Sequence, residues 1–303
     1  MGTFLVILSA LGFSTLGIFG KLAFEAGFTR NQTLLWRFLF ALPFLWLILL
    51  ITRSLPKLGA REGRNSFLRA VALGMVGIGF EATLYFLTLK EVGAALTGIF
   101  LYLYPSFVAL ISHYFLKQKL SRSQWLCIAL SLLGCVLTAD LQNFGSSECK
   151  VTMLGLIYGV LTALWYAVYL LMGSRVSKNE NPLTVSGGVT AGSFLIFAVL
   201  TGYEIFFSSA PSVSLKVPMS MSEWGAILGI ALFSTVLPFT TLYAGMKRVG
   251  PTQTAILSTL EMVFTIILAA LFLGEKLTVL QSFGAFLILL SVILIQRVTP
   301  AKR

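Results

Sequence analysis

Apolar residues fill long stretches of the chain that charged residues rarely interrupt. Because about 20 apolar residues cross a bilayer as a helix, each such run predicts one membrane span. Polar, charged, glycine or proline breaks separate the runs. We therefore predict an all-α integral membrane protein with ten transmembrane helices, at residues 3–22, 33–52, 67–89, 93–116, 121–138, 151–173, 183–203, 223–245, 250–273 and 278–296.

The composition agrees with a membrane protein. Of the 303 residues, 57% are hydrophobic and 11% are charged, whereas soluble domains carry about 25% charged residues. The predicted spans and their loops leave no stretch for a soluble catalytic or nucleotide-binding domain. A net charge of +11 would suggest nucleic acid in a soluble protein. In a membrane protein it indicates cytoplasmic Lys and Arg, so we expect no nucleic-acid partner.

The distribution of positive charge predicts the orientation. An even number of spans places both termini on one side, and the loops on that side carry 15 of the 22 Lys and Arg residues. Cytoplasmic loops carry such an excess. We expect a multi-pass protein of the cell's inner membrane with both termini in the cytoplasm.

The chain contains an internal repeat. Adding 157 to the residue number aligns the fourth and fifth predicted spans with the ninth and tenth without a gap. Two apolar hairpins can align by chance, but polar positions also coincide here. The matches include Val92 with Val249, Gly93 with Gly250, Thr97 with Thr254, Lys119 with Lys276 and Gln124 with Gln281.

The repeat divides the chain into residues 1–140 and 151–303, joined by a polar link at 141–150. Each copy would hold five spans, and an odd number makes the second copy enter the membrane from the opposite side. Inverted repeats of this kind enclose a central site near the bilayer midplane in secondary transporters. We therefore expect alternating access around a central cavity.

Three sequence runs resemble a known family. They are LYLYPSFVAL at 101–110, LEMVF at 260–264 and LGEKL at 273–277. These runs are similar to those of the ten-helix EamA-type members of the drug/metabolite transporter (DMT) superfamily. The first half reads KQK at 117–119 where the family usually has Gly-Glu-Arg, so the acid of that motif occurs only as Glu275. The resemblance implies a cavity surrounded by the first, third, fourth, sixth, eighth and ninth spans.

Two carboxylates, Glu81 and Glu261, fall inside apolar spans. Ionisable groups at membrane depth are costly, so each is a functional candidate that could bind a cation or carry a proton. The repeat aligns Glu81 with Pro238 and Glu261 with Tyr104, so neither acid has a copy in the other half. A structural carboxylate bonded to a neighbouring helix stays open for both, and the resemblance favours it for Glu261.

Aromatic residues make up 13% of the chain, and some fall toward the middle of spans rather than at the interfaces. Such side chains offer flat apolar walls with single polar groups, which suit an organic solute or cation. Ordinary helix packing is the alternative for any one of them. With the two acids, the candidate cavity residues are Phe13, Tyr85, Tyr102, Tyr104, Trp165, Tyr169, Phe239 and Tyr243.

Prolines and glycines suggest bending points. Pro105 and Pro238 interrupt the fourth and eighth spans, and a proline inside a helix kinks it. Gly93 and Gly250 begin the fourth and ninth spans at matching positions. We consider these four residues candidate hinges, with static kinks as the alternative.

Other polar residues have ordinary explanations. Lys21 and Arg37 lie at the ends of two spans, where side chains snorkel to the interface; capture of a substrate carboxylate is the rival interpretation. His113 is interpreted as a packed or interfacial residue. Cys127, Cys135 and Cys149 form neither a metal motif nor a disulfide framework.

The sequence lacks a Walker-type phosphate loop and any catalytic or metal-binding set. We expect no enzyme, cofactor or metal. The predicted function is secondary-active or facilitative transport of a small organic metabolite, an amino acid or related zwitterion, with export expected. Protons are a candidate partner besides the substrate and the bilayer, and the default assembly is a monomer. The alternatives are a multidrug, cationic-compound or nucleoside-type transporter, a non-transporting accessory or lipid flippase subunit, and an intramembrane enzyme.

Overall fold

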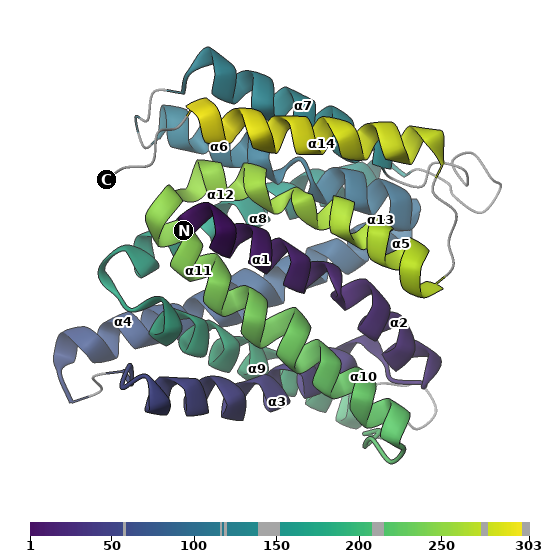
Figure 1. The fold of residues 1–303 in the computed structure, drawn as a ribbon. Coiled ribbons are helices and arrows are strands. Elements are labelled where there is room, and N and C mark those ends of the chain that lie inside the picture. The colour runs from purple at the N-terminus through teal and green to yellow at the C-terminus, as the bar shows by residue number, and fades with distance from the viewer. Residues whose placement is uncertain are drawn as a thin grey trace.

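The fold is described from a computed structural model, over residues 1–56, 59–115, 117, 120–138, 152–207, 215–273 and 278–298. Helices make up most of these residues and none of them lies in a strand (Figure 1). Two π-helical segments, η1 and η2, interrupt the α-helices. The elements in order are α1 (Gly2–Ser14), α2 (Leu16–Glu25), α3 (Arg30–Ile51), α4 (Arg61–Ala72), η1 (Leu73–Ile78), α5 (Gly79–Leu101), α6 (Tyr104–Tyr114), α7 (Arg122–Thr138), α8 (Met153–Asn179), α9 (Pro182–Phe207), α10 (Met221–Ala231), η2 (Leu232–Val236), α11 (Leu237–Val249), α12 (Pro251–Ser258), α13 (Leu260–Leu273) and α14 (Val279–Val298).

The helices confirm the prediction of an all-α membrane protein. Eight helical stretches of the described chain are long and apolar enough to cross a bilayer. They coincide with eight of the ten predicted spans. The other two predicted spans coincide with the shorter apolar helices at Arg122–Leu137 and Val279–Ile295.

Two glycines separate successive helices where the sequence predicts span starts. Gly93 has φ 77° and ψ 173°, and Gly250 has φ 84° and ψ 167°. A residue with a Cβ atom rarely adopts this backbone conformation, whereas glycine adopts it freely. The same local geometry therefore ends the preceding helix and begins the next at two positions 157 residues apart.

The two predicted proline kinks lie at helix starts rather than in helix interiors. Pro105 is the second residue of α6, directly after a break at Tyr102 and Leu103. Pro238 is the second residue of α11 and follows η2. Proline is favoured in the first turn of a helix because its missing N–H has no partner there. Both spans are interrupted near these prolines, but not at them. A break precedes Pro105, and a π-helical segment precedes Pro238.

The packed helix pairs come in matching sets (Figure 1). Helix α7 packs on α14, and α3 packs on α9. Between these pairs, α1 packs on α11 and α5 packs on α8. Met1 and the end of α14 lie toward the same edge of the molecule, which we call the Met1 edge. The junction of α2 with α3 lies toward the opposite edge.

Two of these pairs make the same close contact. A Cβ added at Gly2 on α1 would lie 2.8 Å from Cγ1 of Val249, and one added at Gly155 on α8 would lie 2.5 Å from Cγ1 of Val92. Thus α1 meets α11 as α8 meets α5. A spacing of 153 residues aligns α1 and α2 with α8, including Ser9 with Thr162, Ala10 with Ala163, Leu11 with Leu164 and Gly20 with Gly173.

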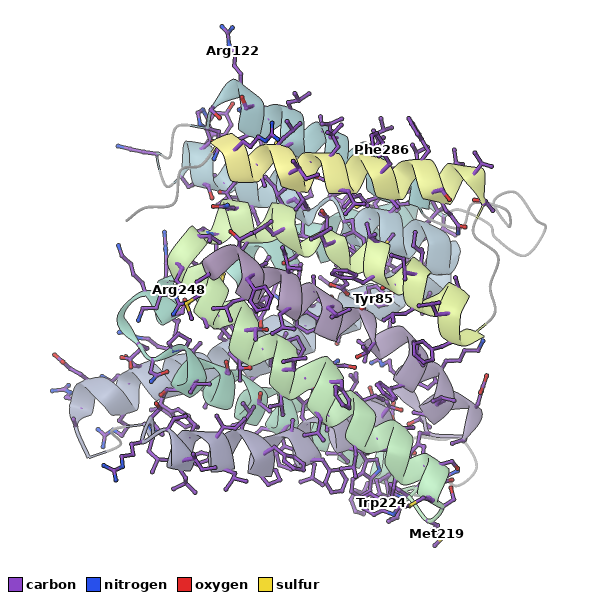
Figure 2. All side chains as sticks on the ribbon, viewed as in Figure 1. Tyr85, Arg122, Met219, Trp224, Arg248 and Phe286 are labelled. Carbon is purple, nitrogen blue, oxygen red and sulfur yellow. The ribbon has the colours of Figure 1, made fainter. Side chains whose placement is uncertain are left out.

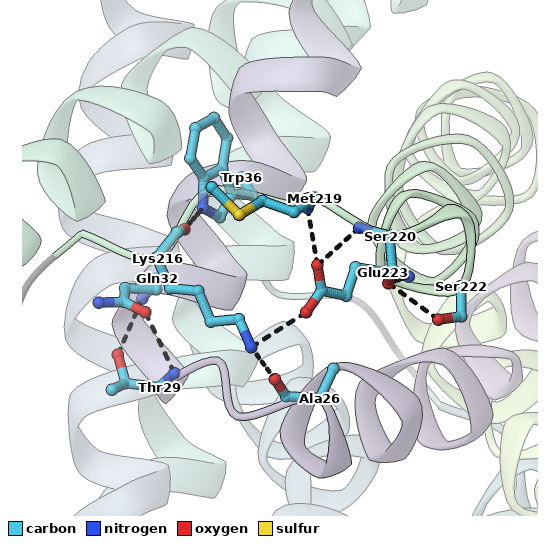
Figure 3. A network of polar contacts seen from close by, with 9 residues as sticks. All are labelled: Ala26, Thr29, Gln32, Trp36, Lys216, Met219, Ser220, Ser222 and Glu223. Atoms are coloured by element: carbon cyan, nitrogen blue, oxygen red, sulfur yellow. Dashed lines mark hydrogen bonds and ion pairs between the residues drawn. The ribbon is translucent and has the colours of Figure 1, made fainter.

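A polar network joins three segments at the opposite edge (Figure 3). Lys216 Nζ lies 3.0 Å from a carboxylate oxygen of Glu223 on α10 and donates a hydrogen bond to the carbonyl of Ala26, just after α2. Ser220 and Glu223 cap the start of α10 reciprocally. The network therefore ties the end of α2 to the start of α10.

Candidate functional site

A cavity of about 330 Å³ lies between helices of both halves of the chain. Most of the residues predicted to face a cavity do line it, although their role in binding stays a prediction. Tyr85 lies in the interior, whereas Arg122 and Arg248 lie at the edges of the molecule (Figure 2). The predicted residues that line the cavity are Phe13, Glu81, Tyr85, Tyr102, Tyr104, Tyr169, Phe239 and Glu261.

These side chains cluster at interruptions of the helices. Glu81 is in the first turn of α5, directly after η1, and Glu261 is the second residue of α13, after a break at Thr259. Tyr102 lies in the break before α6, and Tyr104 follows it. Distorted turns change the direction of the following side chains and occur often at functional sites. The breaks thus bring residues from three spans to one place.

Two predicted residues do not line this cavity. Trp165 faces a second hollow on α8, and its Nε1 donates a 3.1 Å hydrogen bond to the carbonyl of Gly77. Tyr243 lies behind Tyr169, and their hydroxyl oxygens are 2.6 Å apart. The cavity wall instead includes Tyr166, whose ring meets that of Tyr104 edge to face at 4.7 Å. Helical spacing alone did not show that Tyr166, rather than its neighbour Trp165, faces this cavity.

Arg37 lies in the cavity wall, and the prediction that it snorkels to the interface is wrong. Its side chain is buried, with 6% of the residue exposed. Nε donates to Oγ1 of Thr235 at 2.7 Å, and Nη2 donates to the carbonyl of Ser234 at 2.9 Å. Since a guanidinium has five N–H donors, several remain available to a ligand. Lys21, by contrast, is exposed.

The cavity brings two cationic side chains, Arg37 and the outer Arg30, together with two anionic ones. Arg37, Glu81 and Glu261 all line it, yet neither carboxylate lies within the 4.0 Å ion-pair distance of the Arg37 guanidinium. Charges held apart around a cavity can each bind an opposite charge of a ligand. The arrangement therefore suits a small molecule that carries both signs of charge.

Aromatic rings form much of the remaining wall. Phe13 meets Phe239 edge to face at 5.6 Å, and Tyr166 stacks on Tyr169 at 5.8 Å. The hydroxyl of Tyr104 donates to the carbonyl of Ala255 at 3.1 Å, which fixes that ring. A wall of fixed rings offers apolar contact to the body of an organic molecule.

The cavity extends toward the opposite edge. Phe24 and Arg30, on either side of the junction of α2 with α3, belong to its lining. The guanidinium carbon of Arg30 lies 4.0 Å from the centre of the Phe86 ring. Nε of Arg30 also donates to Asn31, which donates to Glu204. Polar groups therefore surround the outer part of the cavity.

Contacts between α8 and α11 lie on the other side of the cavity, toward the Met1 edge. There the hydroxyl pair of Tyr169 and Tyr243 joins the two helices. A Cβ added at Gly173 would lie 3.0 Å from Cε1 of Tyr243, so the helices touch closely. The structure thus contains a cavity on one side and a tight helix contact on the other.

Several sequence predictions are outside this geometry. Glu275, Cys149 and the link at 141–150 fall outside the described residues. His113 lies on α6 and its ring meets that of Tyr114 at 5.0 Å, away from the cavity lining. Within the described residues, no three His, Cys, Asp or Glu side chains are grouped as metal ligands.

Comparison with known proteins gives a consistent result. The profile of the EamA-like transporter family matches residues 1–139 and 153–297. The uncharacterized transporters YcbK and YyaM of Bacillus subtilis (strain 168) are 27% and 29% identical to this chain. The alignments cover 93% and 95% of this chain and 88% and 92% of those proteins. A solved crystal structure that is 18% identical superposes with a TM-score of 0.77 over 98% of this chain and 96% of the other, which shows a shared fold.

Proposed function

This chain belongs to the EamA-like transporter family, part of the DMT superfamily, and is a multi-pass membrane transporter; we propose that it carries a small zwitterionic metabolite, such as an amino acid, across the inner membrane. Alternating access around the central cavity moves the substrate, and export is the proposed direction. The supporting observation is that Arg37, Glu81 and Glu261 face one aromatic-walled cavity.

The charges divide the recognition of a zwitterion between two sets of groups. A substrate carboxylate binds the free N–H groups of Arg37, whose position is fixed by Ser234 and Thr235. A substrate ammonium binds Glu81 or Glu261. Hydrogen bonds in which both partners are ionised are stronger than neutral ones, so this pairing offsets the loss of water around the substrate. The volume of about 330 Å³ falls at the small end of ligand sites.

The repeat supports alternating access. The spacings of 153 and 157 residues align Tyr169 with Leu16, and Tyr243 with Phe86. Tyr169 and Tyr243 bond to each other toward the Met1 edge, while Leu16 and Phe86 both line the cavity. In two inverted five-helix repeats, exchange of these two arrangements closes one side of the cavity and opens the other.

The glycines that align with each other support the same exchange. Gly173 packs against Tyr243, whereas a Cβ added at Gly20 would meet nothing within 4 Å. Both glycines thus occupy the same position in their halves but in opposite environments. The structure corresponds to the state with its cavity toward the opposite edge. With the termini in the cytoplasm, this is the outward-facing state.

Three observations support the proposed topology. Met1 and the end of α14 lie toward one edge (Figure 1), as an even number of spans requires. Most Lys and Arg residues fall in loops predicted on the same side as the termini. The family profile matches two stretches on either side of residues 140–152, as two repeats and a link would give.

An organic cation is the second candidate substrate. Two carboxylates, Glu81 and Glu261, line the cavity, and several aromatic rings face it. Such rings bind cations through their π faces. This alternative requires no role for Arg37 beyond structure, so the behaviour of Arg37 variants separates it from the zwitterion.

Transport by purified protein in liposomes tests the proposal. Labelled neutral amino acids, an organic cation and a nucleoside are offered with and without a pH gradient. We expect amino-acid uptake, and we expect Arg37→Met to weaken it by about 30-fold or more, because a buried charge partner is lost. Arg64→Gln on α4, an exposed site outside the cavity, is the matched control. Size-exclusion profiles check that each variant folds.

Glu81→Gln and Glu261→Gln complete the experiment. Gradient-dependent uptake that one of them abolishes would identify the acid that couples transport to protons. Uptake that needs no gradient and survives both substitutions would make the acids structural and the transport facilitated diffusion. Transport of the cation or nucleoside with none of the amino acids would refute the zwitterion.

A further inference from the structure

A second hollow, of about 470 Å³, lies between α8 and the stretch formed by α4 and η1. Its middle is apolar and includes Leu73, Val76, Val168 and Met172. Val76 and Met172 are 56% and 50% exposed within membrane-spanning stretches, Val76 near the middle of its stretch and Met172 nearer the end. An apolar surface exposed at that depth contacts lipid chains, so the hollow is a groove that opens to the bilayer.

The end of this groove toward the Met1 edge is basic. Arg69 on α4 and Arg175 on α8 line it and are exposed, and neither makes an ion pair with a residue that the structure describes. Among the described residues, Glu180 is the one acid in the lining. Lys247 on α11 adds a further positive charge, since its Nζ donates to the carbonyl of Glu180 at 2.7 Å. The charge at this end is therefore net positive.

We propose that this groove binds an anionic phospholipid. One acyl chain fills the apolar length between η1 and α8, and the phosphate and anionic headgroup lie between Arg69 and Arg175. Basic pockets between transmembrane helices recognise anionic headgroups in this manner. The apolar length and basic end together fit this one class of molecule, because a free phosphate would leave the apolar length unfilled.

The repeat shows that only one half of the protein has the groove. Val76 aligns with Phe233, and Met172 aligns with Phe19. Those two rings stack with centroids 6.1 Å apart. A Cβ added at Gly229 would lie 2.5 Å from Cδ1 of Phe19, so α2 packs tightly on α10. The corresponding space between α8 and α4 is open.

The basic end is also confined to one half. Arg69 aligns with Ala226 and Arg175 aligns with Leu22, so the matching position beside α2 carries no positive charge. The site is therefore a feature of this side of the protein alone. If the Met1 edge faces the cytoplasm, the arginines lie at the leaflet that carries most anionic lipid.

The lipid site is selective for the present conformation. This step rests on the proposed alternating access. In the exchanged state, α8 packs on α4 as α2 now packs on α10, so the groove closes and Tyr169 separates from Tyr243. A lipid in the groove keeps α8 against α11. Because it binds one state and not the other, it raises the population of that state.

Lipid retention tests the site without any transport. The full chain in detergent micelles is mixed with phosphatidylglycerol or phosphatidylethanolamine, and native mass spectrometry measures the bound fraction. We expect the protein to bind phosphatidylglycerol in preference to phosphatidylethanolamine. The double variant Arg69→Gln with Arg175→Gln should reduce this preference by about 30-fold, since each basic residue contributes about fivefold in affinity. Arg61→Gln with Arg64→Gln, exposed on the same helix but outside the groove, should keep the preference.

A spin-label distance tests the state selectivity. Labels at Lys178→Cys on α8 and Arg248→Cys on α11, both exposed positions, in a chain without native cysteines, report the separation of these helices at the Met1 edge. Phosphatidylglycerol should increase the short-distance population in the chain with intact groove arginines and leave the double Arg→Gln variant unchanged.

Equal retention of the two lipids, or retention that the groove substitutions do not change, would overturn the lipid site. If phosphatidylglycerol is retained but the distance between α8 and α11 does not shift, the lipid site does not select one state. The proposed transport function would be unaffected by this result, because the liposome assay tests it separately.

Discussion

Two helix pairs that align in the repeat are packed in opposite ways. Helix α2 packs on α10 and η2 through Phe19, which meets Gly229 and Phe233, while the cavity lies beside Gly20. Helix α8 packs on α11 through Tyr169 and Tyr243, while the lipid-facing groove lies beside Met172. The same sequence pattern thus supports two positions of a helix relative to its neighbours. The difference indicates which contacts the proposed alternating access would break and form.

The two halves also differ where α3 and α9 meet the π-helical segments. On one side, Arg37 of α3 spans the gap to η2 through hydrogen bonds. On the other, α9 approaches η1 closely, and a Cβ added at Gly74 would lie 2.0 Å from the carbonyl oxygen of Val189. One half therefore uses the space for a charged side chain and the other for backbone contact. An asymmetric substrate needs such a difference.

The close approach of α9 should give the largest effect on stability. A Cβ added at Gly192 would lie 1.9 Å from the carbonyl oxygen of Val71, and backbone cannot move as a side-chain tip does. We expect Gly192→Ala to lower the free energy of unfolding by about 3 kcal/mol or more. Gly202→Ala on the same helix meets nothing within 4 Å and should be neutral or slightly stabilising. Thermal unfolding in detergent measures both, and equal melting temperatures would contradict the tight packing.

The aligned glycines beside the cavity sharpen the comparison. Gly173→Ala places a Cβ 3.0 Å from Cε1 of Tyr243, which should disfavour the present contact by about 1–3 kcal/mol. Gly20→Ala should leave the present state unchanged and instead disfavour the exchanged state, in which Gly20 would approach Phe86. The spin-label distance between α8 and α11 is the measurement. Longer distances in the Gly20 variant would reverse the assignment of the open side.

The tyrosine pair should give a moderate effect. Tyr243→Phe removes the hydroxyl that meets Tyr169 at 2.6 Å, which costs about 1 kcal/mol and a roughly fivefold change in population. Leu16→Tyr with Phe86→Tyr places a matching hydroxyl pair on the other side of the cavity. We expect this double variant to favour the exchanged state. A shorter spin-label distance between α8 and α11 in this double variant, as phosphatidylglycerol should give in the wild type, would contradict this pairing.

The fold was largely predictable because each span needs a long apolar run, and such runs are separated by recognisable breaks. Gly93 and Gly250 are examples, since their positive φ values require glycine. Glu81 and Glu261 were also identifiable, because an acid in an apolar span needs a polar environment. All of these signals are local in sequence.

Tyr166 was missed, and Arg37 was interpreted first as a snorkelling residue with substrate capture as the rival, because both roles depend on contacts between distant segments. An arginine near the end of a span has the same local sequence whether it snorkels or points inward. Only the folded η2 segment supplies the acceptors Ser234 and Thr235. Likewise, Tyr166 and Trp165 are neighbours on α8, and the azimuth of that helix decides which one faces the cavity. That azimuth is set by packing, which no single span encodes.

The smallest effects should come from two lysines that tie the differently packed helices in place. Lys216 joins the end of α2 to Glu223 on α10 (Figure 3), and Lys247 joins α11 to the carbonyl of Glu180 at the end of α8. Both contacts hold the present state, so Lys216→Met and Lys247→Met should each shift the population away from it. Because exposed charge contacts contribute about 0–1 kcal/mol, each shift should be fivefold at most.

Salt should weaken the Lys216 contact more than the Lys247 contact, since only Lys216 pairs with a charged group. Spin labels on α2 and α10 and on α8 and α11, read at low and high salt, separate the two. A shift toward the present state in either variant would mean that the contact opposes the packing it joins.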